Sequence, residues 1–174
     1  NTSVVEMVKS IKKGEISSEE LVKNYIKEIK KQEKDVGAWE FFDEELVIAQ
    51  AKKLDLLHQS GNHGDLHGVP VGIKDIFDTA DMPTTDGTEI HKKNPSLNDC
   101  TVVSKLKQAG AIIMGKTVTT ELAYYSPGKT KNPHDLSRTP GGSSSGSAAA
   151  VASHMVPLAV GSQTNGSVIR PASY

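Results

Sequence analysis

Apolar residues in the first third of the chain recur at intervals of three and four, which is the spacing of amphipathic helices. Val8 and Ile11 share one face of a first predicted helix, and Gly14 suits its end. A third helix is predicted over residues 43–57 and ends near Gly61. The N-terminal part of the chain is therefore expected to be helical.

The second predicted helix has the clearest start signal in the chain. Ser17 and Glu20 form a capping box, in which the two side chains satisfy backbone N–H groups that have no partner inside the helix. Leu21, Ile26 and Ile29 then form an apolar stripe, and lysines occupy the other faces. This pattern predicts a helix that packs with one face against a core.

A glycine-containing loop separates the N-terminal helical segment, residues 1–61, from a second part, residues 68–174. Short apolar runs predict three strands in the second part: residues 69–73, 111–114 and 157–161. Asp99 is predicted to cap the helix between the first two strands, and Gly110 to end it. An alanine-rich helix is predicted over residues 147–154. Helices that alternate with short strands predict an α/β fold.

Composition excludes several classes of protein. The 174 residues suit a single domain at about 150 residues per domain, and 36% hydrophobic with 24% charged residues is typical of a globular chain. A net charge of -1 argues against a nucleic-acid binder held by phosphate contacts. No apolar run approaches the length of a membrane span, and the start of the chain lacks a signal-peptide pattern. Cys100 is the only cysteine, which favours a reducing cytoplasm.

Three local motifs match known sites but lack the structural context that those sites need. Residues 110–117 fit the phosphate-loop pattern, yet the inner residues are themselves a predicted strand and a helix precedes them. Ser144 fits the nucleophile position of a G-x-S-x-G elbow, but no predicted strand runs into it. His63 and His67 have the spacing of two metal ligands, but they lie in a glycine-containing loop without further ligands. No metal site is expected.

Three other segments carry a consistent chemistry: residues 72–75 (GIKD), 141–147 (GGSSSGS) and 161–172 (GSQTNGSVIRPA). In this order and at this spacing they resemble the amidase signature family, and the resemblance covers nearly the whole chain. It implies the amidase-signature fold, in which a mixed β-sheet core is flanked by helices and preceded by a helical segment.

The family's Ser–cis-Ser–Lys triad corresponds to Ser167, Ser143 and Lys74. The resemblance implies that Ser167 is the nucleophile, that Ser143 follows a cis peptide bond and that Lys74 is the base. A lysine can take a proton from a serine near neutral pH only where desolvation keeps its amine neutral. Taken alone, a lysine at a strand end is usually solvated. Here, residues 139–174 contribute one charge, Arg170, so a desolvated Lys74 is expected.

Acyl transfer also needs donors for the oxyanion. By the resemblance, the backbone N–H groups of Thr164, Asn165, Gly166 and Ser167 form this oxyanion hole. Asn165 stands where many family members have glycine. Because the donors are backbone groups, this difference need not abolish the hole, although a side chain here narrows the acyl pocket.

Arg170 is the candidate substrate-binding residue. It lies three residues after Ser167, which resembles stand-alone small-amide amidases such as malonamidase, where this arginine binds the carboxylate of the substrate. Arginine suits two-point recognition of a carboxylate. The hypothesis is therefore that Arg170 pairs with a small acidic amide. The alternative is a structural arginine that braces the loop.

The resemblance implies an amide hydrolase that acts on a small carboxamide, releases ammonia or an amine, and needs no metal or organic cofactor. One alternative is an amidotransferase A-type subunit that acts on misacylated transfer RNA, against which the net charge and the form of the second serine motif count. The other is a non-catalytic scaffold relative, against which the intact Lys74, Ser143 and Ser167 count.

Members of the family are usually more than twice as long as this chain. The 174 residues are therefore expected to be the N-terminal part of the amidase core, and to be inactive by themselves. The expected partner is a small-molecule amide, and neither a nucleic acid nor a membrane is expected as a partner. The expected location is the cytoplasm. A homodimer is an open expectation for the quaternary structure.

Overall fold

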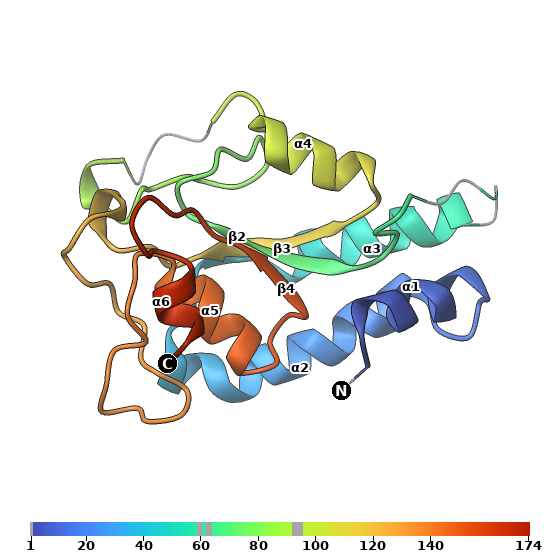
Figure 1. Ribbon diagram of the computed structural model, residues 1–174. Helices are drawn as coiled ribbons and strands as arrows, with labels where there is room; N and C mark the ends of the chain where they lie inside the picture. Colours follow the sequence, from blue (N-terminus) through green and yellow to red (C-terminus); the bar gives the residue numbers. More distant parts are fainter. Residues whose placement is uncertain (1, 59–60, 62–63, 92–95) are drawn as a thin grey trace.

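A four-stranded mixed sheet runs through the molecule, with helices packed on both of its faces (Figure 1). The computed structural model describes residues 2–58, 61, 64–91 and 96–174. None of the helices in these ranges is long and apolar enough to cross a membrane. The α/β fold with a mixed sheet that the sequence predicts is confirmed.

The order of strands in the sheet is β1-β3-β2-β4, so the two most buried strands lie at its centre. Strand β2 pairs in parallel with β3 and β4, and β1 pairs antiparallel with β3. The strand bounds are β1 (Trp39–Phe42), β2 (Pro70–Lys74), β3 (Ile112–Thr117) and β4 (Leu158–Val160). Every residue of β2 and β3 is buried, as expected of strands that are covered on both faces.

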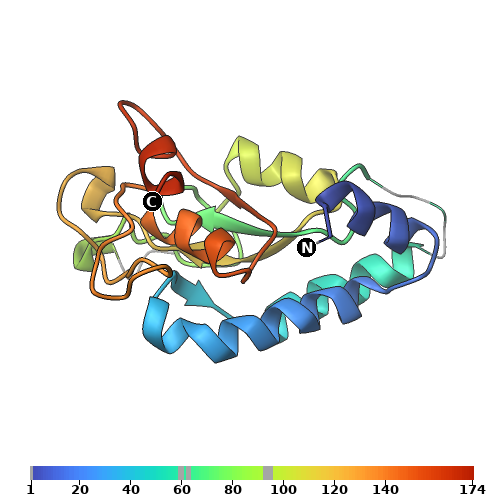
Figure 2. The same cartoon turned by 60° about the horizontal axis from the view of Figure 1, so that its bottom comes forward.

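Six α-helices are described: α1 (Val4–Lys12), α2 (Ser18–Val36), α3 (Glu44–His58), α4 (Thr101–Gln108), α5 (Ser145–Ala152) and α6 (Ile169–Ala172). Two short 3-10 turns, Glu89–His91 and Glu121–Ala123, lie in the connections. Figure 2 shows α2 and α3 below the sheet and α4 above it. Ile112 and Met114 pack with α2, α3 and α5, whereas Ile113 packs with the α4 side, as the alternation of side chains along a strand requires.

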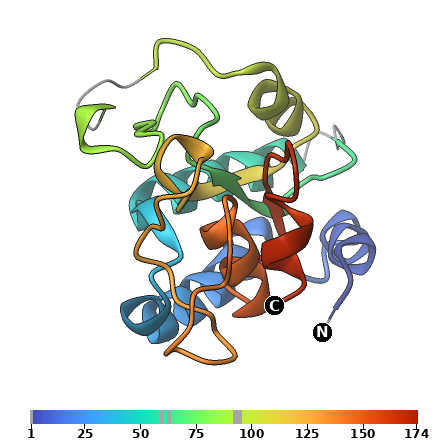
Figure 3. The same ribbon diagram turned by 60° about the vertical axis from the view of Figure 1, so that its left-hand side comes forward.

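The loops that follow the parallel strands gather at one end of the sheet, where the C-terminal segment also lies (Figure 3). Parallel strands end at the same edge, and polar groups on the loops beyond that edge therefore come together. This is the end at which Lys74 leaves β2.

Local signals in the sequence predict part of this architecture. The capping box of Ser17 and Glu20 is present at the start of α2. The prediction that Asp99 caps α4 is wrong, because the N-cap residue is Cys100. The Asp99 carboxylate instead accepts a hydrogen bond from Ala80 N at 2.8 Å and pairs with Lys107 at 2.9 Å. Strand β1 was not predicted.

Helix α5 lies very close to the sheet at Gly146. A Cβ atom added at this residue would come within 2.3 Å of both Ala38 O and Val118 N. These are backbone atoms, so they cannot move aside as a flexible side chain could. The close approach also brings the start of α5, which carries the serine-rich loop, against the end of β3.

We expect Gly146→Ala to lower the free energy of unfolding by about 3 kcal/mol, because overpacking a rigid contact forces the helix away from the sheet. Urea unfolding of the natural protein and of the variant measures this loss of unfolding free energy. Gly14→Ala is the control, since no atom lies within 4 Å of its added Cβ and φ is 71°. The strained backbone there costs only about 1 kcal/mol. Equal losses in the two variants would contradict the close packing of α5.

Candidate active site

The side chain of Lys74 is fully buried and surrounded by neutral oxygen atoms. Its Nζ donates to Ser143 Oγ at 2.6 Å and to Ser162 Oγ at 2.9 Å. The carbonyl oxygen of Ser162 lies 3.4 Å from the same Nζ. Strand β2 thus delivers the amine to a point between the serine-rich loop before α5 and the segment after β4.

Burial lowers the pKa of Lys74 from 10.5 to about 8, since the charged ammonium loses its hydration inside the protein. The surrounding hydroxyl and carbonyl groups are dipoles and do not balance a full positive charge. A substantial fraction of the amine is therefore neutral slightly above neutral pH. A neutral amine in contact with the Ser143 hydroxyl can accept its proton.

The loop that carries Ser143 is anchored on both sides of a cis peptide bond between Gly142 and Ser143. The carbonyl oxygen of Ser143 accepts a hydrogen bond from Thr120 N at 3.0 Å. The carbonyl oxygen of Gly142 accepts one from Arg170 Nη2 at 2.9 Å. These contacts fix the position of the Ser143 hydroxyl relative to Lys74.

Ser167 lies beside this loop but is joined to it through the backbone. Its carbonyl oxygen accepts a hydrogen bond from Ser144 N at 3.0 Å, and its side chain is partly exposed. The described contacts of Ser167 do not include a hydrogen bond from its hydroxyl to Ser143 or Lys74. The structure therefore brings Lys74 and Ser143 into direct contact and places Ser167 next to them without closing that last hydrogen bond.

The four expected oxyanion-hole donors lie in an open turn, residues 164–167. Among the described residues, none of their backbone N–H groups donates to a protein acceptor. Gln163 holds the turn from behind, because its Oε1 accepts from Val168 N at 3.0 Å and from Ile169 N at 2.9 Å. The N–H groups of the turn are thus left available to a ligand.

Two residues of the site were missed by sequence reasoning. Ser162 contacts the amine of Lys74, and Gln163 supports the turn that follows. Both lie inside the motif of residues 161–172, so their position in the motif was available as a signal. Their roles depend on which way each side chain points, and the sequence does not fix that direction.

Arg170 is exposed and lines a cavity of about 360 Å³ next to the serine-rich loop. Three aromatic side chains also line this cavity: Tyr124, Tyr125 and Tyr174. The hydrogen bond from Nη2 to Gly142 O means that Arg170 braces the loop.

Two of the three local motif matches, the phosphate-loop match and the G-x-S-x-G match, lie in buried parts of the structure. No group of three metal-ligating side chains is found in the part of the chain that the structure describes, and His63 lies outside the described residues. Ser144 is buried, and its Oγ donates to Ser162 O at 3.2 Å. In the phosphate-loop match, residues 112–117 form the buried strand β3. Its backbone N–H groups cannot face a phosphate.

Comparison with known proteins identifies the family. A family model described as Amidase matches residues 20–174. The chain belongs to the amidase family. Among solved structures, the peptide amidase from Stenotrophomonas maltophilia aligns with a TM-score of 0.93 and 31% identity, over 99% of this chain and 38% of that enzyme. The resemblance seen in the three motifs is confirmed.

The curated relatives include A subunits of glutamyl-tRNA(Gln) amidotransferase. The subunit from Nitrosococcus oceani is 40% identical over 98% of this chain and 37% of its own length. The subunit from Symbiobacterium thermophilum is 44% identical over 92% of this chain and 35% of its own length. The chain thus spans little more than a third of the length of these relatives.

The burial of Lys74 predicts a dependence of stability on pH. Its pKa is about 8 in the folded protein and 10.5 in the unfolded chain, so the unfolded chain holds more protons between these values. The contribution of Lys74 to stability therefore rises with pH through this window. Below pH 8 the buried amine is destabilising.

We expect Lys74→Met to raise Tm at pH 7 by about 3 °C, and this gain to shrink toward pH 10.5. Thermal unfolding of both proteins at pH 7 and pH 10 measures the difference. Lys105→Met, on the exposed face of α4, is the control and should show no gain that depends on pH. A gain for Lys74→Met that is the same at both pH values would contradict the lowered pKa.

Proposed function

We propose that this site breaks amide C–N bonds through an acyl-enzyme intermediate, with Ser167 as nucleophile, Ser143 as proton relay and Lys74 as base. The observation that supports this proposal most directly is the 2.6 Å contact between the buried Lys74 amine and the Ser143 hydroxyl. Membership of the amidase family supports the same chemistry. A serine needs an adjacent base to become a nucleophile, and this is the base that the site offers.

In the proposed reaction, neutral Lys74 accepts a proton from Ser143 while Ser143 accepts one from Ser167. The Ser167 oxygen attacks the carbonyl carbon, and the resulting oxyanion is bound by the N–H groups of residues 164–167. The proton returns through Ser143 to the nitrogen as the C–N bond breaks, which releases ammonia or an amine. Water then attacks the ester by the same route and frees the carboxylic acid.

The two candidate substrates are supported by different observations. Arg170 in the cavity lining and the net charge of -1 support a small acidic carboxamide and a stand-alone enzyme. The identity with amidotransferase A subunits, 40% to 44%, supports a subunit that delivers ammonia from an amide donor to an acceptor. The relatives carry more weight, because the hydrogen bond of Arg170 to Gly142 O already gives this arginine a structural role. A cytoplasmic protein suits either reading.

We expect a fluorophosphonate probe to label Ser167 in the full natural protein, because the probe reacts with activated serines whatever the substrate. Peptide mass spectrometry locates the adduct. Lys74→Ala and Ser143→Ala should each slow labelling by about 1000-fold, since both remove the route for the proton. Lys105→Ala should leave the rate unchanged. A natural protein that is never labelled, or labelling that survives Lys74→Ala, would contradict the proposed function.

A substrate panel separates the two candidates. Ammonia release is measured with half-amides of short dicarboxylic acids, with neutral amides of equal length and with glutamine. Each measurement is made with and without the proteins that co-purify with this protein from its natural source. The stand-alone enzyme predicts turnover of the acidic amides without partners, and a rise in KM of about 10-fold for them alone in Arg170→Lys. The amidotransferase subunit predicts glutamine turnover that requires the partners. Unchanged KM for every acidic amide in Arg170→Lys would remove the carboxylate role of this residue.

A further inference from the structure

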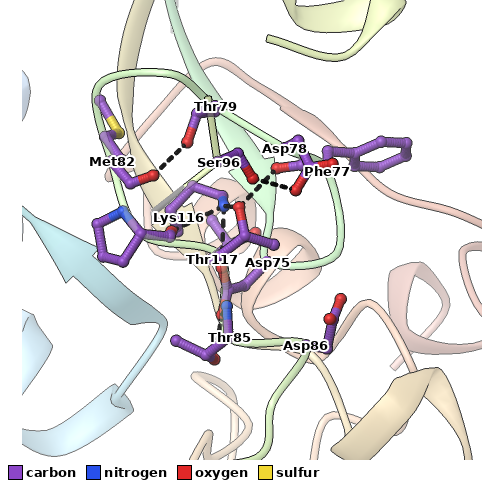
Figure 4. A network of polar contacts seen from close by, with 12 residues as sticks. Asp75, Phe77, Asp78, Thr79, Met82, Thr85, Asp86, Ser96, Lys116 and Thr117 are labelled. Carbon is purple, nitrogen blue, oxygen red and sulfur yellow. Dashed lines mark hydrogen bonds and ion pairs between the residues drawn. The ribbon is translucent and has the colours of Figure 1, made fainter. Parts of the chain in front are cut away.

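A second lysine near the site is buried as an ion pair. Lys116 Nζ on β3 lies 3.0 Å from Oδ1 of Asp75, the residue that directly follows Lys74, and both side chains are fully buried (Figure 4). Separated from water, an ion pair of this kind is costly unless further polar groups satisfy it. The proposed reaction uses neither residue.

Further hydrogen bonds surround the pair and tie it to the loop that follows β2. Lys116 Nζ donates to Pro83 O at 3.0 Å and to Thr84 Oγ1 at 2.7 Å. The Asp75 carboxylate accepts from Thr85 N at 3.2 Å and from the Thr85 hydroxyl. Figure 4 shows Lys116 in the middle of this network, with the loop folded around it. The pair therefore fixes residues 83–85 to the central strands.

The backbone of Asp75 is held as firmly as its side chain. Its N–H donates to Thr117 O at 2.9 Å, which continues the pairing of β2 with β3 beyond Lys74. Its carbonyl oxygen accepts from Asp86 N at 3.0 Å, which closes the loop. Lys74 thus precedes a residue with almost no freedom to move.

The sheet separates the two lysines. Ile73 pairs with Lys116 and Lys74 pairs with Thr117, and successive side chains point to opposite faces. Thr117 Oγ1 lies 2.7 Å from Ser147 Oγ of α5, so Lys74 shares the α5 face. Lys116 and Asp75 lie toward the other face. The carboxylate next to the amine in sequence is therefore turned away from it and neutralised by a different cation.

We propose that Asp75 and Lys116 are positioning residues for Lys74: their ion pair fixes the strand end that carries Lys74 and keeps the Asp75 carboxylate from stabilising a positive charge on it. This inference rests on the proposed function, in which Lys74 must be neutral. A carboxylate free to approach Lys74 would favour the ammonium form and remove the base.

The charged groups around both lysines determine what substitution should do. Lys74 faces the neutral oxygens of Ser143 and Ser162. Lys116 faces Asp75 and, at longer range, Asp78 and Asp86; burial lowers the pKa of Lys116 and these carboxylates oppose the change. Asp78 accepts a hydrogen bond from Ser96, and Asp86 lies 2.9 Å from His91 Nδ1. Loss of the Lys116 charge therefore leaves a net negative charge beneath the strand end.

The experiment measures the rate of fluorophosphonate labelling of Ser167 against pH in the full natural chain and in three variants. The unsubstituted protein should reach half of its plateau rate near pH 8, the pKa of Lys74. In Lys116→Met this midpoint should rise by about one pH unit, because the unpaired Asp75 carboxylate stabilises the Lys74 ammonium. Lys107→Met is the matched control: it removes a cation on α4 that pairs with Asp81 and Asp99, and it should leave the midpoint unchanged.

The double variant Asp75→Asn with Lys116→Met keeps the test open if Lys116→Met does not fold, because it buries no unpaired charge. Its midpoint should return to that of the natural protein, while its plateau rate falls by about 10-fold because the anchor of the strand end is lost. A natural plateau rate in the double variant, an unchanged midpoint in folded Lys116→Met, or an equal shift in Lys107→Met would overturn the positioning role. Absence of labelling in the unsubstituted protein would instead overturn the proposed function, and this inference with it.

Discussion

The central interaction of the structure is a buried amine that has no countercharge and contacts a serine hydroxyl. This is the amine of Lys74, at the end of a strand that is covered on both faces, with its Nζ 2.6 Å from Ser143 Oγ. Burial of a lysine costs free energy, and the rest of the fold offsets that cost. The two central strands, the helices on both faces and the nearly uncharged segment from residue 139 onward all exclude water and carboxylates from this point.

The loops around the amine are held by hydrogen bonds to backbone groups, and Arg170 is the one charged donor among the contacts named here. Thr120 and Arg170 bind the two carbonyl groups next to Ser143, and Ser144 N binds the carbonyl of Ser167. Gln163 closes the turn of residues 164–167 from behind. These anchors include no carboxylate, so they fix geometry without favouring the charged form of the nearby lysine. The buried ion pair of Asp75 with Lys116 lies across the sheet.

Sequence reasoning succeeded where the signal is local. The capping box at Ser17 and the apolar run of β2 depend on neighbours a few residues away, and both are present in the structure. Sequence reasoning failed where contacts with residues far away in the sequence determine the local structure. Strand β1 is too short to show alternation of apolar and polar residues, and it forms because it pairs with β3. Asp99 does not cap α4 because its carboxylate binds Ala80 N and Lys107 instead. For the candidate site, the motifs predict which residues gather, but the contacts of Ser162, Gln163 and Lys116 require the fold.

A titration of Lys74 itself shows whether its buried amine is neutral near pH 8. The protein is labelled with ¹³C at the ε-carbon of lysine, and the Lys74 signal is assigned by its absence in Lys74→Ala. NMR spectra of the full natural chain then follow this signal from pH 6 to pH 11. Burial of the amine predicts a midpoint near pH 8, well below the 10.5 of a solvated lysine. A midpoint at or above 10.5 would mean that the amine is charged at neutral pH, and Lys74 would then be excluded as the base.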